Sequence, residues 1–278
     1  MKLSLIINHY REPEMLKMSL GYALKALAYL KESAGVETEI IVTDSETLPQ
    51  TAQMMQTLFP EVIFLAEEKN IGFGKSVNRA VRKANGEFTF VMNADVILAF
   101  PDALTKLLAF VEKNSEVGIA GPKLLNINGS LQASAFRFYT PLTILARRTL
   151  FGKSPWGKKN LHTFLIKDKA AALAATVPVD WVMGSAFLCR RERFLNLGMF
   201  DETFFMYMED VDLCRRFWER GYKVMYYPEA TAYHYHFQAS KKRGGILDAL
   251  FNKYTRIHLK SAYTYFKKHG LNTPRYGI

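Results

Sequence analysis

The feature that most constrains the fold is an alternation, in the first half of the chain, between short apolar runs and longer amphipathic windows. The apolar runs cover residues 3–8, 39–43, 62–66 and 88–92, and the windows between them cover residues 14–33, 50–58 and 73–84. Short apolar runs that alternate with helical patterns are typical of βαβ units, in which helices cover a parallel sheet. The sequence therefore predicts an α/β fold with a Rossmann-like, mostly parallel central sheet flanked by helices.

The pattern is less regular after the fourth run. Asn85-Gly86 is expected to cap the third helix. The later segments are predicted as a helix (101–113), a strand (117–121), an irregular stretch (126–177), a strand-like run (179–190), two helices (192–197 and 210–221), two strands (223–227 and 230–236) and a long amphipathic helix (246–268). A long irregular stretch in a compact domain is usually functional or mobile.

Composition places the chain among ordinary soluble proteins. Its 278 residues are 49% hydrophobic and 23% charged, which is enough to bury a substantial core. The two cysteines are too few for a disulfide framework and form no metal-type or redox-type pair. Polar residues interrupt the apolar start at Asn8, and no apolar run approaches the roughly 20 residues of a membrane span. We therefore expect a cytoplasmic protein.

The net charge of +11 is concentrated in basic clusters at residues 147–159, 241–243 and 267–268. Such clusters occur in proteins that bind nucleic acid, an anionic membrane or a phosphorylated substrate, and they also occur as plain solvated surface. No nucleic-acid-binding motif accompanies them, so we expect no nucleic-acid partner.

Two short acidic motifs are the main candidates for chemistry. The first, Asn93-Ala94-Asp95, ends the apolar run at 88–92. Open α/β sheets bind ligands at the carboxyl ends of their strands, and carboxylate oxygens suit Mg²⁺ or Mn²⁺ holding a diphosphate. An Asx turn that merely ends the strand explains the same residues equally well.

The second motif, Glu209-Asp210-Val211-Asp212, follows the aromatic run Phe204-Phe205-Met206-Tyr207. A carboxylate beside an apolar wall can have a pKa suited to a general base. Three carboxylates at a helix start are also explained by the helix dipole alone. A third element, His234 and His236 on one side of a strand, is a weak metal-ligand pair.

Taken together, these motifs resemble glycosyltransferase family 2, especially its rhamnosyltransferase-like branch. The resemblance extends over roughly residues 3–240 and is carried, in order, by residues 68–80, 84–87, 93–96, 181–187, 200–205 and 209–213. It implies a GT-A fold, with a nucleotide-sugar-binding half at residues 1–121, an acceptor-binding and catalytic half at 122–240, and an amphipathic helical tail at 241–278.

The resemblance also assigns roles to residues. Asp210 would be the catalytic base that deprotonates the acceptor hydroxyl, with inversion at the anomeric carbon, and Glu209 would position the acceptor or the base. Asp95 would be the carboxylate ligand of a divalent metal, Mg²⁺ or Mn²⁺, with Asn93 in place of the family's first Asp. His234 would lie near the metal and the diphosphate.

Further nucleotide-sugar contacts are implied by the same resemblance. Asp44 would hold the base, although Asp44-Ser45-Glu46-Thr47 departs from the usual Asp-Asn-x-Ser. Gly72 and Asn78 would approach the nucleotide sugar, or Gly72 would serve only a turn. Trp181 and Gly184 would line the junction of donor and acceptor, where Trp181 is either a stacking platform or plain core.

The expected activity is transfer of a rhamnose-like or other hexose from a UDP- or dTDP-linked donor to a glycan or lipid-linked acceptor in cell-surface polysaccharide synthesis. A nucleotidyltransferase is disfavoured because His9-Tyr10-Arg11-Glu12 is not a Gly-rich, Lys-containing loop. A nucleotide- or glycan-binding module with a degenerate site stays open because Asn93 replaces an Asp.

The C-terminal amphipathic helix has two interpretations. Its apolar positions, among them Ile246, Leu250, Ile257 and Tyr265, recur at helical spacing with Lys and Arg between them. The helix either packs on the domain or lies on an anionic membrane, which would place the protein peripherally at the inner face of the plasma membrane.

Overall fold

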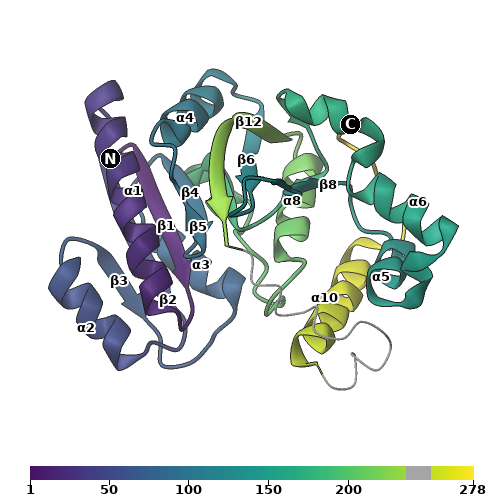
Figure 1. Ribbon diagram of the computed structural model, residues 1–278, viewed down its shortest axis with the longest axis horizontal. Coiled ribbons are helices and arrows are strands. Elements are labelled where there is room, and N and C mark those ends of the chain that lie inside the picture. Colours follow the sequence, from purple (N-terminus) through teal and green to yellow (C-terminus); the bar gives the residue numbers. More distant parts are fainter. Residues whose placement is uncertain (236–251) are drawn as a thin grey trace.

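The alternating pattern forms a parallel sheet in the computed structural model, which describes residues 1–235 and 252–278. Strands β1 (Leu3–His9), β2 (Thr38–Asp44), β3 (Ile63–Ala66) and β4 (Phe88–Asn93) pair in parallel in the order β3-β2-β1-β4 (Figure 1). Helices α1 (Pro13–Ala34), α2 (Pro49–Leu58) and α3 (Phe73–Lys83) connect them. The carboxyl ends of these four strands therefore line one edge of the sheet.

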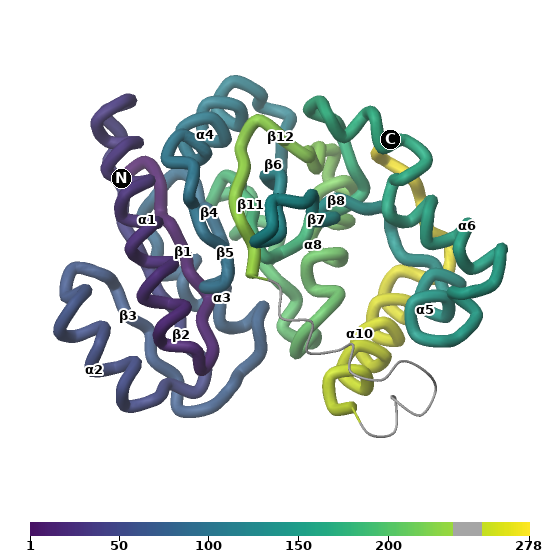
Figure 2. The backbone as a smooth tube through the Cα atoms, in the orientation of Figure 1, coloured from purple at the N-terminus to yellow at the C-terminus, as the bar shows by residue number. Residues whose placement is uncertain are grey.

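The second half of the chain extends the same sheet (Figure 2). Strand β11 (Ala186–Arg190) lies antiparallel between β4 and β6 (Val117–Leu125), and β12 (Lys223–His234) runs parallel to β6. The short strands are β5 (Val96–Ile97), β7 (Leu131–Gln132) and β9 (Val177–Pro178) at the margins, and β8 (Ala135–Phe136) with β10 (Trp181–Val182) as a separate pair. Outside residues 141–174, the described part of the second half contains the helices α4 (Ala103–Lys113), α7 (Arg191–Asn196), α8 (Glu209–Glu219) and α10 (Lys253–His269).

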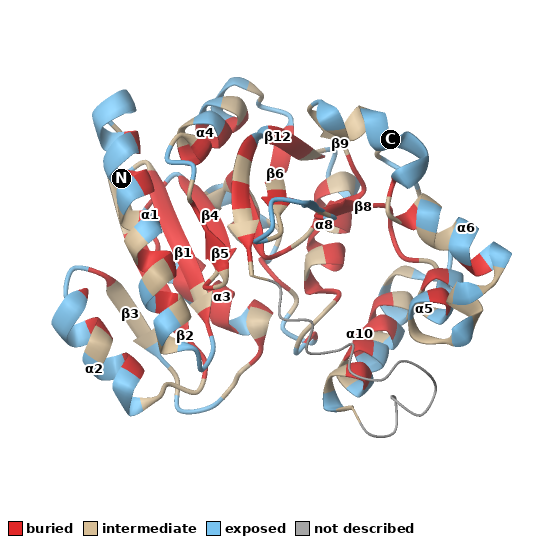
Figure 3. Ribbon diagram, in the orientation of Figure 1, coloured by how far each residue is buried: buried red, intermediate tan, exposed pale blue. Residues whose placement is uncertain are grey.

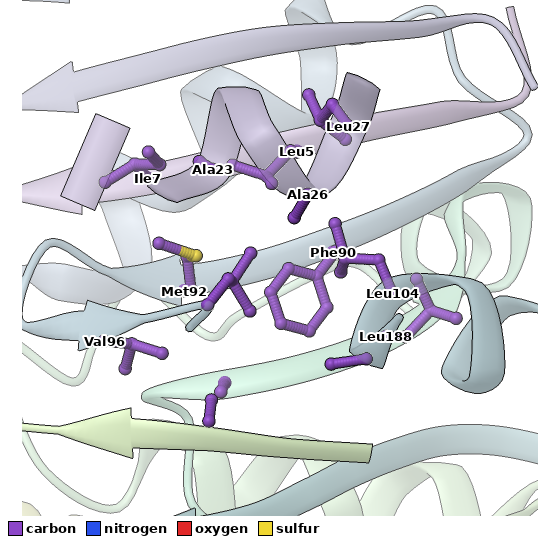
Figure 4. Close-up of a cluster of buried hydrophobic side chains, with 14 of the residues drawn as sticks. Leu5, Ile7, Ala23, Ala26, Leu27, Phe90, Met92, Val96, Leu104 and Leu188 are labelled. Atoms are coloured by element: carbon purple, nitrogen blue, oxygen red, sulfur yellow. The ribbon is translucent and has the colours of Figure 1, made fainter. Parts of the chain in front are cut away.

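The sheet is buried on both faces because alternate residues of its strands serve two cores. On β1, Leu5 and Ile7 pack with α1 and α4, whereas Ile6 packs on the side of α3 and α8. Figure 4 shows the first of these cores, where Phe90 and Leu188 come together from β4 and β11. Figure 3 shows the buried strands inside helices whose outer faces are exposed. The predicted α/β class with a mostly parallel sheet is confirmed.

The prediction of an irregular stretch at 126–177 is wrong. The segment contains α5 (Pro141–Arg148), η1 (Leu150–Lys153), α6 (Pro155–Phe164) and η2 (Lys167–Ala174). Pro141 and Pro155 stand at the first helical position, where a missing N–H costs nothing. Thr140 accepts a hydrogen bond from the Thr143 amide, and Ser154 accepts one from the Gly157 amide. Proline is also common in loops, but here Pro141 and Pro155 begin helices, and Thr140 and Ser154 cap them.

Three boundaries also differ from the predictions. The strands expected at 223–227 and 230–236 are one strand, β12, with a register shift between Tyr227 and Thr231. The run at 179–190 is divided between β10 and β11, which lie in different sheets. Asn85-Gly86 does not cap α3, because the cap residue is Ala84, whose backbone is extended. Gly86 is required for a different reason: a Cβ there would lie 2.5 Å from the Ser4 nitrogen.

The described part of the C-terminal helix packs on the domain. Its buried side chains are Thr255, His258, Ser261, Ala262 and Tyr265. The predicted helix positions 246–251 and His236 lie outside the described residues. Among the helices of residues 1–235 and 252–278, none combines the length and the hydropathy that a membrane crossing requires.

A buried carboxylate, Asp180, fastens the C-terminal residues to the body. Its Oδ2 accepts a hydrogen bond from the Phe138 amide, and its Oδ1 accepts hydrogen bonds from the Tyr276 and Gly277 amides, all at 2.9 Å. A Cβ on Gly277 would lie 2.4 Å from the Val179 Cα, so the two segments are in direct backbone contact.

We predict that Asp180→Ala lowers the free energy of unfolding by about 3 kcal/mol, because three amides lose their acceptor at a site that is 1% exposed. Urea denaturation measures the change. Glu116→Ala is the control, since it removes an exposed pair with Lys223 that is worth less than about 1 kcal/mol. Equal losses in the two variants would contradict the role given to Asp180.

Candidate active site

Polar side chains collect at the carboxyl ends of three strands and in an adjoining turn. Asp44 ends β2, Asn93 ends β4 and His234 ends β12, while Asp95 lies in the turn between β4 and β5. The pairing of His234 with Val96 brings β12 alongside this turn, and the Tyr235 amide donates to the Asp95 carbonyl at 2.8 Å. Four of the predicted site residues therefore lie at the edge of the sheet where open α/β folds bind ligands.

Asp44 is held by a histidine that the sequence analysis did not select. The Glu12 amide donates to His9 Nε2 at 3.0 Å, so this ring nitrogen is an acceptor and the proton of a neutral ring is on Nδ1. Nδ1 lies 2.7 Å from Asp44 Oδ1 and donates to it. Among the described residues, no group donates to Asp44 Oδ2. His9 thus fixes one oxygen of Asp44 and leaves the other as an acceptor.

Asp95 and His234 face each other as predicted. The Gln132 amide oxygen can only accept, so His234 Nδ1 donates to it at 2.6 Å, and His234 Nε2 points to Asp95 Oδ1 at 3.3 Å. Gln132 is therefore a second residue that the sequence analysis missed. It fixes the ring and the tautomer of His234, as outer partners of metal-binding histidines commonly do.

The residues present fit a divalent cation. Within the described chain, Asn93 Oδ1 and Asp95 Oδ1 are buried oxygens without a hydrogen-bond partner, and a neutral His234 presents a lone pair to Asp95. The carboxylate and amide oxygens suit Mg²⁺ or Mn²⁺. In residues 1–235 and 252–278, no group of three or more His, Cys, Asp or Glu residues is arranged so that it could hold a metal ion by itself. Phosphate and water oxygens would have to complete the coordination.

The second acidic motif begins α8. Asp210 Oδ2 accepts a hydrogen bond from the Gly184 amide and Oδ1 accepts one from the Val211 amide, both at 2.9 Å. Tyr207 and Met208, immediately before the helix, both have a positive φ (68° and 70°). Non-glycine residues rarely adopt this conformation, and it commonly marks a functional site.

The two carboxylates of this pair have different electrostatic surroundings. Burial, followed by the charge of Asp210, raises the pKa of Glu209 well above its ordinary value. Burial also raises the pKa of Asp210, but its two amide donors, Gly184 and Val211, oppose the shift. Glu209 Oε2 has no donor among the described residues. Of the two carboxyls, Glu209 therefore retains its proton more readily than Asp210.

A short segment before β11 joins the two motifs. The Ser185 carbonyl accepts a hydrogen bond from the Asn93 amide at 2.9 Å, and the neighbouring Gly184 amide donates to Asp210. A Cβ on residue 184 would lie 3.0 Å from the Asp210 Cβ. Gly184 is therefore required for the close approach of α8, and the Asn93 and Asp210 segments become parts of one site.

Three predicted binding residues belong to the scaffold instead. Gly72 has φ 90°, and a Cβ there would lie 2.4 Å from the Phe205 carbonyl oxygen, which favours its interpretation as a turn residue. Asn78 is buried, donates to the Phe200 carbonyl and accepts from the Phe200 amide. Trp181 is 5% exposed and stacks on Phe136 with ring centroids 4.4 Å apart. The alternative interpretation of Trp181, a core residue, therefore holds.

An aromatic and basic wall borders the Asp210 side of the site. Tyr139 contacts the ring of His258, which also contacts Tyr207, three residues before Asp210. Arg147 of α5 donates to the Tyr139 hydroxyl and lies over its ring. Burial, followed by the charges of Arg148 and Arg147, lowers the pKa of His258 to about 3, so its ring is neutral. The basic cluster at 147–148 was noted in the sequence, but its place beside the acidic motif was not.

Comparison with known proteins identifies the family. The family model described as glycosyltransferase-like family 2 matches residues 2–257. The chain belongs to this family. The family assignment made from the sequence motifs is thereby confirmed, and the chain is a glycosyltransferase.

Among curated relatives, the chain is similar to an N-acetylglucosaminyl-diphospho-decaprenol L-rhamnosyltransferase of Mycobacterium tuberculosis, with 27% identity across 86% of this chain and 80% of the relative. It is also similar to the rhamnosyltransferase WbbL of Escherichia coli K12, with 27% identity across 71% of this chain and 70% of the relative.

Solved structures confirm the GT-A fold. The mannosyltransferase PcManGT of Pyrobaculum calidifontis, in complex with GDP-Man and Mn²⁺, superposes with a TM-score of 0.61 and 17% identity over 98% of this chain and 66% of that one. GalNAc-T7, with UDP, GalNAc and Mn²⁺, gives a TM-score of 0.60 and 17% identity over 84% of this chain. The present chain spans 44% of the GalNAc-T7 length.

The third carboxylate of the acidic motif, Asp212, has a structural role and gives a pH prediction. Burial raises its pKa, but hydrogen bonds and charges from His269, Arg216 and Lys268 lower it to about 2 in total. An unfolded Asp titrates near 3.9, so the depressed folded pKa stabilises the protein above about pH 4. This stabilisation is lost as the pH falls from 4 towards 2 and amounts to roughly 2–3 kcal/mol.

We predict that Asp212→Asn removes this component of the acid sensitivity. The wild type should lose more unfolding free energy than the variant between about pH 5 and pH 3, as measured by urea denaturation across that interval. Parallel pH profiles for the two proteins would contradict the assignment.

Proposed function

We propose that the chain is an inverting glycosyltransferase that moves a rhamnose-like or other hexose from a nucleoside diphosphate sugar to a glycan or lipid-linked acceptor in cell-surface polysaccharide synthesis. The observation that carries the proposal is the Gly184-Ser185 bridge, which connects the Asp210 carboxyl group to the oxygen-rich tip at Asn93. A single displacement requires one carboxylate, Asp210, to accept the proton of the acceptor hydroxyl. It requires another, Asp95, on the side of the leaving diphosphate.

We propose that Asp44 binds the base of the donor nucleotide. Because His9 occupies Asp44 Oδ1, one carboxylate oxygen is left to accept a hydrogen bond. Uracil and thymine present a single imide N–H between two carbonyls, whereas guanine presents two adjacent donors that prefer both oxygens. This supports a UDP- or dTDP-linked donor. Gly72 and Asn78 would act indirectly, by shaping the loop at the nucleotide sugar.

On the diphosphate side, Asp95 and His234 would hold the divalent cation, with Asn93 close by. When bound, Mg²⁺ or Mn²⁺ supplies Lewis-acid stabilisation of the charge on the leaving diphosphate. Gln132 keeps His234 Nε2 directed towards Asp95.

On the acceptor side, Asp210 would accept the proton of the attacking hydroxyl. Its two amide donors hold the carboxylate in place, and burial keeps its pKa above that of a solvated Asp, which strengthens it as a base. Attack from the face opposite the diphosphate in one displacement inverts the anomeric carbon. Glu209, the more readily protonated partner, would donate a hydrogen bond to the acceptor or position the base.

The acceptor would enter along the wall of Tyr139, Arg147 and His258. The Mycobacterium tuberculosis relative is named for a diphospho-decaprenol acceptor, and a basic wall beside Asp210 suits a phosphorylated acceptor of that class. We accordingly propose residues 1–121 as the donor half, 122–240 as the acceptor and catalytic half, and a cytoplasmic location at the inner membrane face.

The decisive variant is Asp210→Asn, which keeps the shape of the side chain but removes its basicity. We expect turnover to fall by about 10²- to 10⁴-fold while nucleotide affinity is retained. Turnover is measured as release of the nucleoside diphosphate with Mg²⁺ or Mn²⁺ across a panel of nucleotide sugars. Calorimetry measures the affinity for the nucleotide. Glu116→Gln on the surface is the matched control.

Wild-type turnover in Asp210→Asn would reject the base assignment. A wild type that binds nucleotide but releases no product with any donor and acceptor would instead favour the alternative, a binding module with a degenerate site.

A second prediction concerns the cation. We expect Asp95→Asn, and to a smaller extent Gln132→Ala, to weaken Mn²⁺-dependent binding of the nucleoside diphosphate by about 10- to 100-fold, because one removes a ligand charge and the other releases His234. Calorimetry with and without Mn²⁺ measures the difference. If both variants bound nucleotide as the wild type does in Mn²⁺, the cation site would lie elsewhere.

A further inference from the structure

The α5–α6 lobe, defined as residues 141–164, exposes large apolar side chains next to basic ones. The exposed fractions are 44% for Leu142, 46% for Leu145, 69% for Leu150 and 74% for Trp156. The lobe carries five Lys and Arg residues and no Asp or Glu. Figure 3 shows much of its surface as exposed or intermediate.

These side chains stand on a tightly joined unit. Leu142 and Leu145 are three residues apart on α5 and therefore share a face. A Cβ on Gly152 would lie 2.1 Å from the Ala146 carbonyl oxygen, and one on Gly157 would lie 2.0 Å from the Phe151 carbonyl oxygen. These two glycines hold η1 against α5, and α6 against η1. Leu150 and Trp156 therefore belong to the same closely packed unit as α5.

We propose that the α5–α6 lobe is a docking surface for an anionic lipid bilayer, a proposal that rests on the glycosyltransferase function above. Surfaces that combine exposed Leu and Trp side chains with Lys residues bind at the boundary of lipid headgroups and acyl chains, where the apolar side chains insert. Lys153, Lys158 and Lys159 are exposed around them and complement anionic headgroups. Without a covering partner, so many exposed large apolar side chains would be unfavourable in water.

The position of the lobe favours a membrane over a protein partner. Tyr139, two residues before α5, belongs to the wall beside Asp210, so docking brings the acceptor side of the site to the bilayer surface. A lipid-linked acceptor would then reach Asp210 without leaving the membrane. The lobe lies at the end of the molecule opposite α2 (Figure 1), so the donor side stays open to solvent. This assigns membrane contact to the lobe, where the sequence had suggested the C-terminal helix.

Trp156 provides a direct probe. The other tryptophans, Trp181 and Trp218, are buried or half-buried and donate their indole N–H to backbone carbonyls. We expect vesicles of phosphatidylcholine with phosphatidylglycerol to shift the emission of the full chain to the blue, and phosphatidylcholine vesicles alone to have a much smaller effect. Trp156→Phe should keep vesicle binding and lose the shift.

Co-sedimentation with the same vesicles gives the affinity. Leu150→Ser and Trp156→Ser should each weaken binding by about tenfold, since each removes a large apolar side chain from the lipid contact. Lys158→Gln should weaken vesicle binding by about fivefold, and a higher salt concentration should weaken the binding of the wild type and of the variants further. Leu58→Ser is the matched control, because Leu58 is a 52% exposed leucine on α2 at the far end of the molecule.

The proposal is overturned if wild-type protein ignores the anionic vesicles, or if Leu150→Ser and Trp156→Ser bind them as tightly as Leu58→Ser does. It is equally overturned if the substitutions abolish a dimer of the free protein, since a second copy would then cover the lobe. Transfer to a water-soluble acceptor, measured on the same preparations, keeps the two proposals separate. Turnover without vesicle binding rejects the docking surface alone, whereas vesicle binding without any turnover rejects the glycosyltransferase site.

Discussion

The candidate site depends on one pair of backbone interactions, made by two neighbouring residues before β11. The Gly184 amide binds Asp210, and the Ser185 carbonyl binds the amide of Asn93. Because β11 runs antiparallel beside β4, its beginning lies next to the end of β4. The proposed base and the proposed metal side are therefore fixed relative to each other through the backbone of residues 184–185. A side chain on Gly184 would push α8 away and separate them.

Burial raises the pKa of all three carboxyls at the start of α8, and their different partners decide the outcome. Asp212 has basic partners and is held ionised, so it stabilises the fold. Glu209 has none among the described residues and is driven towards its protonated form, and Asp210 is held between these extremes by two amides. Carboxylates with such different partners serve different purposes. The positive φ angles of Tyr207 and Met208 show that the backbone is under local strain where these groups are presented.

Much of the fold followed from hydrophobic periodicity, and much of the site from strand ends. Asn93 and Asp95 were found because a buried apolar run that stops at a polar side chain places it at the ligand-binding edge, whereas Asp44 was implied by the family resemblance. The same rule, applied to β1, would have selected His9. Gln132 could not be found in this way, because it lies on a two-residue strand and matters only through its contact with His234. The helices of residues 141–164 were missed because a proline in a sequence can mark either the end or the beginning of a helix, and Pro141 and Pro155 begin helices.

The sequence alone determined the α/β class, the family and the two acidic motifs, because these are encoded in local periodicity and in short runs of residues. Only the tertiary structure decided that Trp181 and Asn78 pack within the scaffold, that the Gly184 amide binds Asp210, and that Arg147 and His258 form a wall beside Asp210. It also decided that exposed apolar and basic side chains gather on the α5–α6 lobe. Each of these outcomes depends on contacts between residues far apart in the chain, and hydrophobic pattern records which residues are buried but not what they are buried against.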